Sequence, residues 1–138
     1  MTMHRRTVEL TCSAVDGHAE EDVSAYPTSS IALLTRLHAV RYAGDQLALT
    51  VSEVDPADED DEDAEDTPGA MLLHVFETDD KVYYPRVAEV VDQDGAAIAN
   101  EYVPVILGTT KVRIEVDGPA LSTATVELFY ETAGDQRF

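Results

Sequence analysis

The sequence predicts an all-β protein, an antiparallel β-sandwich or jelly roll of about eight strands with an acidic, flexible loop. Three observations carry this prediction. Polar and apolar residues alternate without a break over Lys111–Val116, and a second alternation covers Thr123–Tyr130. A period of two residues is the pattern of a half-buried strand. Similar short runs recur along the chain between Gly, Pro and Asp turn residues, as in sandwiches and jelly rolls.

The two closing runs are separated by the turn residues Asp117, Gly118 and Pro119. We therefore expect them to be adjacent strands that share one apolar face. Such a face must be covered by a second layer. The upstream part of the chain has to supply that layer.

The first predicted strand is Thr7–Cys12, which alternates cleanly. A turn at residues 16–17 and a polar loop over His18–Asp22 follow. Cys12 falls on the apolar side of this strand and is the only cysteine of the chain, so it has no partner for an intrachain disulfide. A buried, inert thiol is expected.

Residues 29–42 carry mixed signals. Their apolar positions fit one face of a helix with a Ser N-cap, but Leu33–Tyr42 also fits a strand. Predicted β segments on both sides favour the strand. Alternation restarts over Leu47–Val51 after the turn residues 43–45, so we expect these two strands to form a hairpin.

The middle of the chain supplies the remaining predicted strands. Met71–Phe76 is a short apolar run bounded by turn residues, and Lys81–Tyr84 is a second candidate that ends at a proline. Residues 92–95 form a turn. Glu101–Leu107 follows as a strand that carries Pro104, which confines it to a sheet edge or a bulge.

Residues 53–66 contain ten of the 28 acidic residues and no basic one. Mutual repulsion should keep this segment extended and mobile, and we interpret residues 53–69 as an acidic loop insertion. A calcium loop is the alternative. Counted from Asp58, however, the sixth and twelfth positions hold Asp63 and Gly69, where an EF-hand requires Gly and Glu. The sequence therefore predicts no dedicated metal site.

At 138 residues the chain is expected to be one domain. Its predicted parts are a basic N-terminal arm over residues 1–6, a β-sandwich over residues 7–131 with the acidic insertion, and a loose tail over residues 132–138. The arm is the only local concentration of positive charge on an acidic protein.

The formal net charge of −19 excludes two classes of partner. Nucleic acid and anionic membranes both require clustered Lys and Arg, so neither is expected as a partner. Two of the nine basic residues are Lys, a bias that suits either a high-salt environment or a GC-rich genome. The chain shows no apolar run of membrane-spanning length and no secretory signal, so we expect synthesis in a cytoplasm.

The residues give no sign of catalysis or of a cofactor. The four histidines lack metal-ligand spacing, and the sequence contains no nucleophile elbow or phosphate-binding glycine loop. Asp92 and Asp94 could act as a carboxylate pair, but both stand in a turn that favours Asp for conformational reasons. We expect a protein that is not an enzyme.

Two short segments are candidates for binding a partner. In Tyr83-Tyr84-Pro85-Arg86, adjacent strand residues face opposite ways, so one tyrosine should enter the core and the other remain exposed. An exposed tyrosine beside an arginine is either an interface anchor or a sheet-edge residue. The basic arm is either a frayed terminus or a tether to an acidic partner. The candidate partner-binding residues are His4, Arg5, Arg6, Tyr83, Tyr84 and Arg86.

The order of several short strings resembles a family of small virion proteins encoded among the head genes of tailed phages. The strings are TVELT, RYAGD, VYYPR, DQDG, EYVPVILG, KVRIEV and TATVELFYE. The resemblance covers most of residues 7–131. VYYPR together with EYVPVILG is its distinctive part, and the acidic run over residues 58–66 departs from the family pattern.

The resemblance implies a β-sandwich that decorates or cements a capsid, often as a trimer on the shell. The expected partner is the major capsid protein or another virion protein, and the expected location is the capsid surface. A neck, tail or fibre-associated module is one alternative. A carbohydrate- or cell-surface-binding sandwich is another, although the absence of Trp disfavours it.

Overall fold

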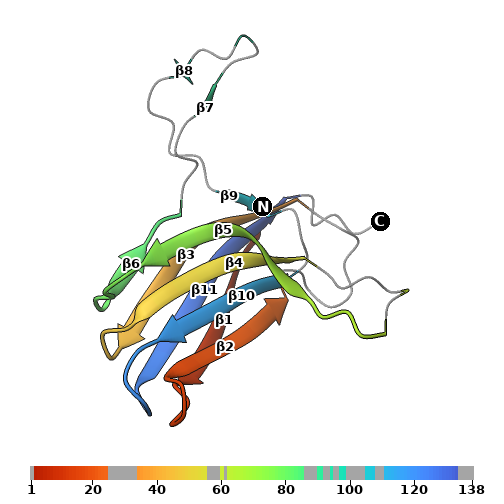
Figure 1. Cartoon of the computed structure of the whole chain (residues 1–138). Coiled ribbons are helices and arrows are strands. Elements are labelled where there is room, and N and C mark those ends of the chain that lie inside the picture. The colour runs from red at the N-terminus through yellow and green to blue at the C-terminus, as the bar shows by residue number, and fades with distance from the viewer. Residues whose placement is uncertain are drawn as a thin grey trace.

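The structure is a computed structural model that describes residues 2–24, 34–55, 60, 62–85, 90–91, 94, 97–98, 105–107 and 111–133. Most of these residues form two antiparallel sheets packed face to face, which confirms the predicted all-β sandwich (Figure 1). Among them, none belongs to a helix that is long and apolar enough to span a membrane.

Sheet 1 has the strand order β1-β11-β3-β6, and β9 also pairs with β3. Its strands are β1 (Thr2–Thr11), β3 (Leu34–Gly44), β6 (Lys81–Tyr83), β9 (Val105–Leu107) and β11 (Thr123–Ala133). Sheet 2 has the order β2-β10-β4-β5 and consists of β2 (His18–Ser24), β4 (Ala48–Asp55), β5 (Thr67–Val75) and β10 (Lys111–Asp117). A separate two-stranded sheet pairs β7 (Val90–Val91) with β8 (Ala97–Ile98).

This strand order is that of a jelly roll. The chain can be described as one long hairpin that is rolled up. Its strand pairs are β1–β11, β2–β10, β3–β6 and β4–β5, and successive pairs lie alternately in sheet 1 and sheet 2. Such a rolled hairpin closes two four-stranded layers over one core. If β6 and β9 are counted as one interrupted edge strand, the roll has eight strands.

The edge strand formed by β6 and β9 is interrupted by a long excursion. Tyr83 lies opposite Val40, and Val105 lies opposite Leu37. The chain therefore advances 22 positions in sequence and only three along β3 between these two pairs. The excursion contains β7 and β8, which extend away from the sandwich in Figure 1. Of the predicted strand Glu101–Leu107, the described part is β9.

The two closing strands alternate as predicted, but they are not neighbours in one sheet. β10 lies in sheet 2 between β2 and β4, and β11 lies in sheet 1 between β1 and β3. Their apolar faces therefore cover each other across the sandwich. The buried residues that they contribute are Val112, Ile114, Val116, Ala124, Val126, Leu128 and Tyr130.

The predicted strand Leu33–Tyr42 is confirmed as β3, but the predicted hairpin with residues 47–51 is wrong, because β3 and β4 belong to different sheets. The backbone turns between the sheets at Gly44, which has a φ of 132°. Asp45 holds this crossing in place: its N–H donates to the Thr123 carbonyl at 3.0 Å, and its carboxylate accepts the Thr123 N–H at 2.9 Å. Alternation indicates which face a residue occupies and does not identify the strand beside it.

The predicted polar loop over His18–Asp22 is also wrong, because these residues belong to β2. β2 is an edge strand of sheet 2 and pairs only with β10 among the described strands. Glu21 lies opposite the buried Ile114 and is itself exposed. This acidic residue at an inward position obscures the alternation, and the sheet edge tolerates it because the side chain reaches water.

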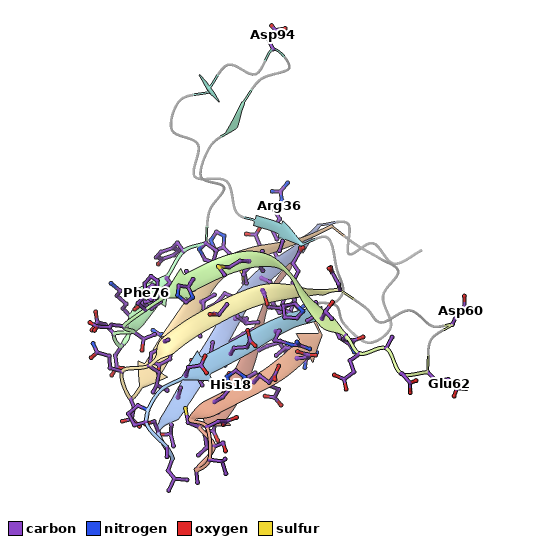
Figure 2. All side chains as sticks on the ribbon, viewed as in Figure 1. His18, Arg36, Asp60, Glu62, Phe76 and Asp94 are labelled. Atoms are coloured by element: carbon purple, nitrogen blue, oxygen red, sulfur yellow. The ribbon has the colours of Figure 1, made fainter. Side chains whose placement is uncertain are left out.

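Three predicted boundaries also change. Residues 2–6 of the predicted arm are part of β1, whose pairing with β11 runs from Thr2 opposite Thr132 to Thr11 opposite Thr123. β11 correspondingly extends into the predicted tail as far as Ala133. Both ends of the predicted insertion, residues 53–55 and 67–69, lie in β4 and β5. Figure 2 shows Asp60 and Glu62 projecting from the remaining link, away from the sheets.

Candidate functional site

The outer face of sheet 1 contains an open hollow of about 420 Å³. Its floor is Ala39, which is 5% exposed although it lies opposite the outward-facing Phe129. The register shifts here, because Phe129 pairs with Ala39 and Tyr130 with Leu37, which leaves His38 as the extra residue of a bulge. A small side chain among larger ones creates the hollow, whose lining residues are Met3, Arg5, His38, Ala39, Arg41, Val82, Tyr84 and Phe129.

The rim of the hollow combines apolar and cationic side chains. Met3 is 51% exposed and Tyr84 is 60% exposed. Arg5 and Arg41 both lie near the carboxylate of Glu127, at 3.6 Å and 4.0 Å. The carboxylate of Glu127 is thus the shared counterion of two guanidinium groups, which leaves an excess of positive charge beside the hollow.

The structure brings Arg5 and Tyr84 together and separates the other predicted partner-binding residues. His4 stacks on the buried Tyr130 with ring centroids 5.2 Å apart. Arg6 pairs with Leu128, one position along β1 from Arg5, so it points to the other side of the sheet. Positions 4–6 therefore do not form one basic surface.

The two tyrosines divide as predicted, which the burial of their side chains confirms. Tyr83 packs against the core, and its hydroxyl accepts the N–H of Asp79 at 2.9 Å. The ammonium group of Lys81 lies 5.1 Å from the centre of its ring. Tyr84 points outward into the hollow. Arg86 lies outside the described residues.

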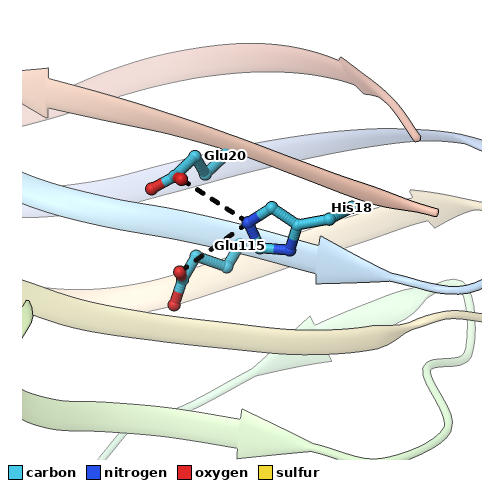
Figure 3. A group of neighbouring side chains, drawn as sticks. All are labelled: His18, Glu20 and Glu115. Carbon is cyan, nitrogen blue, oxygen red and sulfur yellow. Dashed lines mark ion pairs between the residues drawn. The ribbon is translucent and has the colours of Figure 1, made fainter. Parts of the chain in front are cut away.

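A second cluster of polar side chains lies on the outer face of sheet 2. His18, Glu20 and Glu115 bring one ligand-type atom each to within 4.8 Å of one another (Figure 3). The Nε2 atom of His18 lies 3.6 Å from a carboxylate oxygen of Glu20 and 3.9 Å from one of Glu115. Its other ring nitrogen, Nδ1, lies 2.6 Å from a carboxylate oxygen of Asp117.

Strand register explains why these side chains meet. In the pairing of β2 with β10, Asp22 lies opposite Arg113, Glu20 opposite Glu115, and His18 opposite Asp117. The hydrogen bond with Asp117 raises the pKa of His18, and the carboxylates of Glu20 and Glu115 act in the same direction. Two like charges stand directly opposite each other at the centre of the cluster.

Arg113 supplies the permanent positive charge nearest to this cluster. Its side chain donates to both carboxylate oxygens of Asp22, at 2.8 Å and 3.2 Å, and lies 3.3 Å from Glu20. The hydrogen bond with Asp22 raises the pKa of Arg113. Arg113 also donates to the carbonyl of Asp66 at 3.2 Å, which ties the end of the acidic link to sheet 2.

Sequence reasoning missed this second cluster because His18–Asp22 was expected to be a loop. The missed signal is the period of two in His18, Glu20 and Asp22, with Ala19 and Val23 on the inner side, where both pack against the core. Read as a strand, the segment places all three polar side chains on one face.

Cys12 is buried, as predicted, and burial raises the pKa of its thiol. A protonated thiol inside the core is a poor nucleophile. Cys12 therefore contributes to the packing of the core.

Comparisons with known proteins find no match: no family model, no curated protein and no solved structure is similar to this chain at a significant level.

Proposed function

We propose that this chain is a structural virion protein that decorates or stabilises the capsid of a tailed phage or virus, and that it docks through the hollow on sheet 1. The observation that supports this proposal is the contrast between the two outer faces of the jelly roll. Viral capsid domains and lectins share this architecture, so the fold is compatible with the role, and the surface of the molecule supports it further.

Charge separates the two sheets. The strands of sheet 1 contain five Lys or Arg residues and three Glu, whereas the strands of sheet 2 contain seven Asp or Glu residues and two Lys or Arg. A protein with a net charge of −19 thus carries one sheet with a slight excess of positive charge. The acidic remainder opposes self-association at high concentration, and the two arginines beside the hollow attract an acidic partner.

The hollow has the composition of a binding surface. Tyr and Arg are the residue types that most often dominate binding energy at interfaces, and Tyr84, Arg5 and Arg41 stand around an apolar floor. The partner that fits is a protein surface with an apolar projection flanked by carboxylates, which would pair with the two guanidinium groups. In this proposal the major capsid protein supplies that surface, and the chain binds it as a homotrimer on the capsid, without a cofactor.

Binding to capsids tests the proposal. Capsids from the virus that encodes the chain, stripped of this protein, are mixed with purified chain and sedimented, and the bound protein is quantified. We expect Arg5→Glu to abolish most binding. Lys111→Glu is the matched control, because it makes the same charge change at a similarly exposed residue of sheet 2.

Equal loss of binding in both variants, or undiminished binding in Arg5→Glu, would contradict docking through sheet 1. Electron microscopy of the particles tests the role itself. Hundreds of copies on the shell support decoration, and a few copies at the neck, tail or fibre support the alternative module. Specific binding on a glycan array, without binding to capsids, would favour a carbohydrate-binding sandwich.

Light scattering coupled to gel filtration, at low and high salt, tests the oligomer. A trimer that is stabilised by salt supports both the trimeric assembly and adaptation to high salt, because salt screens repulsion between acidic copies. A monomer at every salt concentration would contradict both.

A further inference from the structure

We propose that His18, Glu20 and Glu115 bind a divalent transition-metal ion of the zinc class on the outer face of sheet 2. This site lies on the opposite side of the molecule from the proposed docking hollow, and the inference is independent of the proposed function. Its ligands come from two neighbouring strands, with His18 and Glu20 on β2 and Glu115 on β10 (Figure 3).

The spacing of the three ligand atoms suits one ion. Zinc binds imidazole nitrogen and carboxylate oxygen at about 2.0–2.2 Å, so ligand atoms around a tetrahedral ion lie roughly 3.3–3.6 Å apart. The Nε2 atom of His18 is 3.6 Å and 3.9 Å from the two carboxylates, and no pair of atoms in the group exceeds 4.8 Å. The longer separations must therefore close by up to about 1 Å when an ion binds, and the exposed side chain of Glu20 has room to move toward His18.

Asp117 prepares His18 to act as a ligand. When the Nδ1–H of His18 donates to Asp117, across 2.6 Å, the lone pair of the neutral ring is on Nε2, which faces Glu20 and Glu115. A carboxylate that holds the distal nitrogen of a ligand histidine is the usual support of a protein-bound metal. Asp117 is a positioning residue here and does not touch the ion.

The charge around the cluster favours a dication. Four carboxylates face one another there, from Glu20, Asp22, Glu115 and Asp117, and the permanent cation among them is Arg113. Glu20 and Glu115 are directly opposed across the strands, where like charges repel. Arg113 is hydrogen-bonded to Asp22, so an ion between the two glutamates removes a repulsion that Arg113 relieves only in part.

The donor set selects the class of ion. One imidazole and two carboxylates suit zinc, cobalt or nickel, and three protein ligands leave a position for water. Magnesium and calcium prefer sites built wholly from oxygen and gain little from the imidazole. The acidic link between β4 and β5 is an oxygen-only surface, and excess magnesium would occupy it and leave the histidine-containing site available.

The test uses the full chain, stripped with EDTA and then titrated with Co²⁺ in an excess of Mg²⁺. Binding is followed by the visible absorption of protein-bound cobalt and by calorimetry with Zn²⁺. We expect one ion per chain and at least about tenfold weaker binding in His18→Ala and Glu115→Gln. His74→Ala is the matched control, because His74 also lies on sheet 2 and hydrogen-bonds Thr50 instead of the cluster.

Asp117→Asn tests the positioning role, with an expected loss of about 10–100-fold in affinity while the cobalt spectrum persists. Each variant is compared with the wild type by circular dichroism, so that unfolding is not mistaken for loss of a ligand. Absence of the cobalt bands in the wild type, displacement of cobalt by magnesium, or equal losses in His74→Ala and His18→Ala would overturn the proposal. The outcome of the metal titrations does not alter the expected binding to capsids, which involves sheet 1.

Discussion

The outer faces of the two sheets have the same backbone geometry and different electrostatics. At the centre of sheet 1, Glu127 of β11 lies near two arginines, and at the centre of sheet 2, Glu115 of β10 lies opposite another glutamate. Both glutamates are about one fifth exposed, at 19% and 23% of the side chain. The comparison shows that the strand pattern builds the layer, and the cross-strand neighbours decide what the outer face of that layer attracts.

The largest expected effect on stability comes from the core that the two sheets share. Ile114 is fully buried between the sheets, so Ile114→Ala removes packing from both layers at once. We expect a loss of about 2–5 kcal/mol in the free energy of unfolding, measured by urea denaturation. A loss below about 1 kcal/mol would mean that the two sheets do not share a tightly packed interior.

The next effect concerns the turn that leads from sheet 1 to sheet 2. Gly17 has a φ of 66°, and a Cβ at this position would lie 2.0 Å from the backbone oxygen of Gly118. We expect Gly17→Ala to cost at least about 1–3 kcal/mol of stability, because backbone strain and a backbone clash add. Gly69→Ala is the control, since its added Cβ meets the movable side chain of Asp55. Equal thermal stability of the two variants would contradict this account.

The comparison of the two central glutamates predicts effects of opposite sign. In metal-free buffer at low salt, Glu127→Gln should destabilise the protein by about 0.2–1 kcal/mol, because it removes the counterion of Arg5 and Arg41. At a pH at which His18 is neutral, Glu115→Gln should stabilise it by a similar amount, because it relieves repulsion with Glu20. Both differences should shrink in concentrated salt. Changes of the same sign would refute the contrast between the faces.

The smallest expected effect is a pH dependence on sheet 2. Because its partners raise the folded-state pKa of His18 above 6.5, protonated His18 stabilises the fold. That contribution is fully present below the unfolded-state pKa and is lost as the pH rises through the folded-state pKa. In EDTA, the stability difference between wild type and His18→Gln should therefore be largest at low pH and should decline as the pH rises through the folded-state pKa of His18. A difference that grows with rising pH would show the opposite linkage.

Much of the fold could be predicted because each buried strand displays its own inward face. The inward positions 112, 114 and 116 and the positions 124, 126, 128 and 130 were correctly expected to be apolar and buried. β2 was missed because Glu21 breaks its alternation at an exposed edge. The site was predicted only in part: Arg5 and Tyr84 meet in the hollow, whereas His4 and Tyr83 pack toward the interior.

The sequence by itself determined that the chain forms strands, which residues enter the core, and that the protein as a whole is strongly acidic. The tertiary structure decided which strands are neighbours, and thereby that the hollow unites β1, β3, β6 and β11, and that His18 meets a carboxylate 99 positions away. The physical reason is that a period of two specifies the face on which a side chain lies. The choice of neighbouring strand depends on how the whole hairpin rolls up, which no single segment encodes.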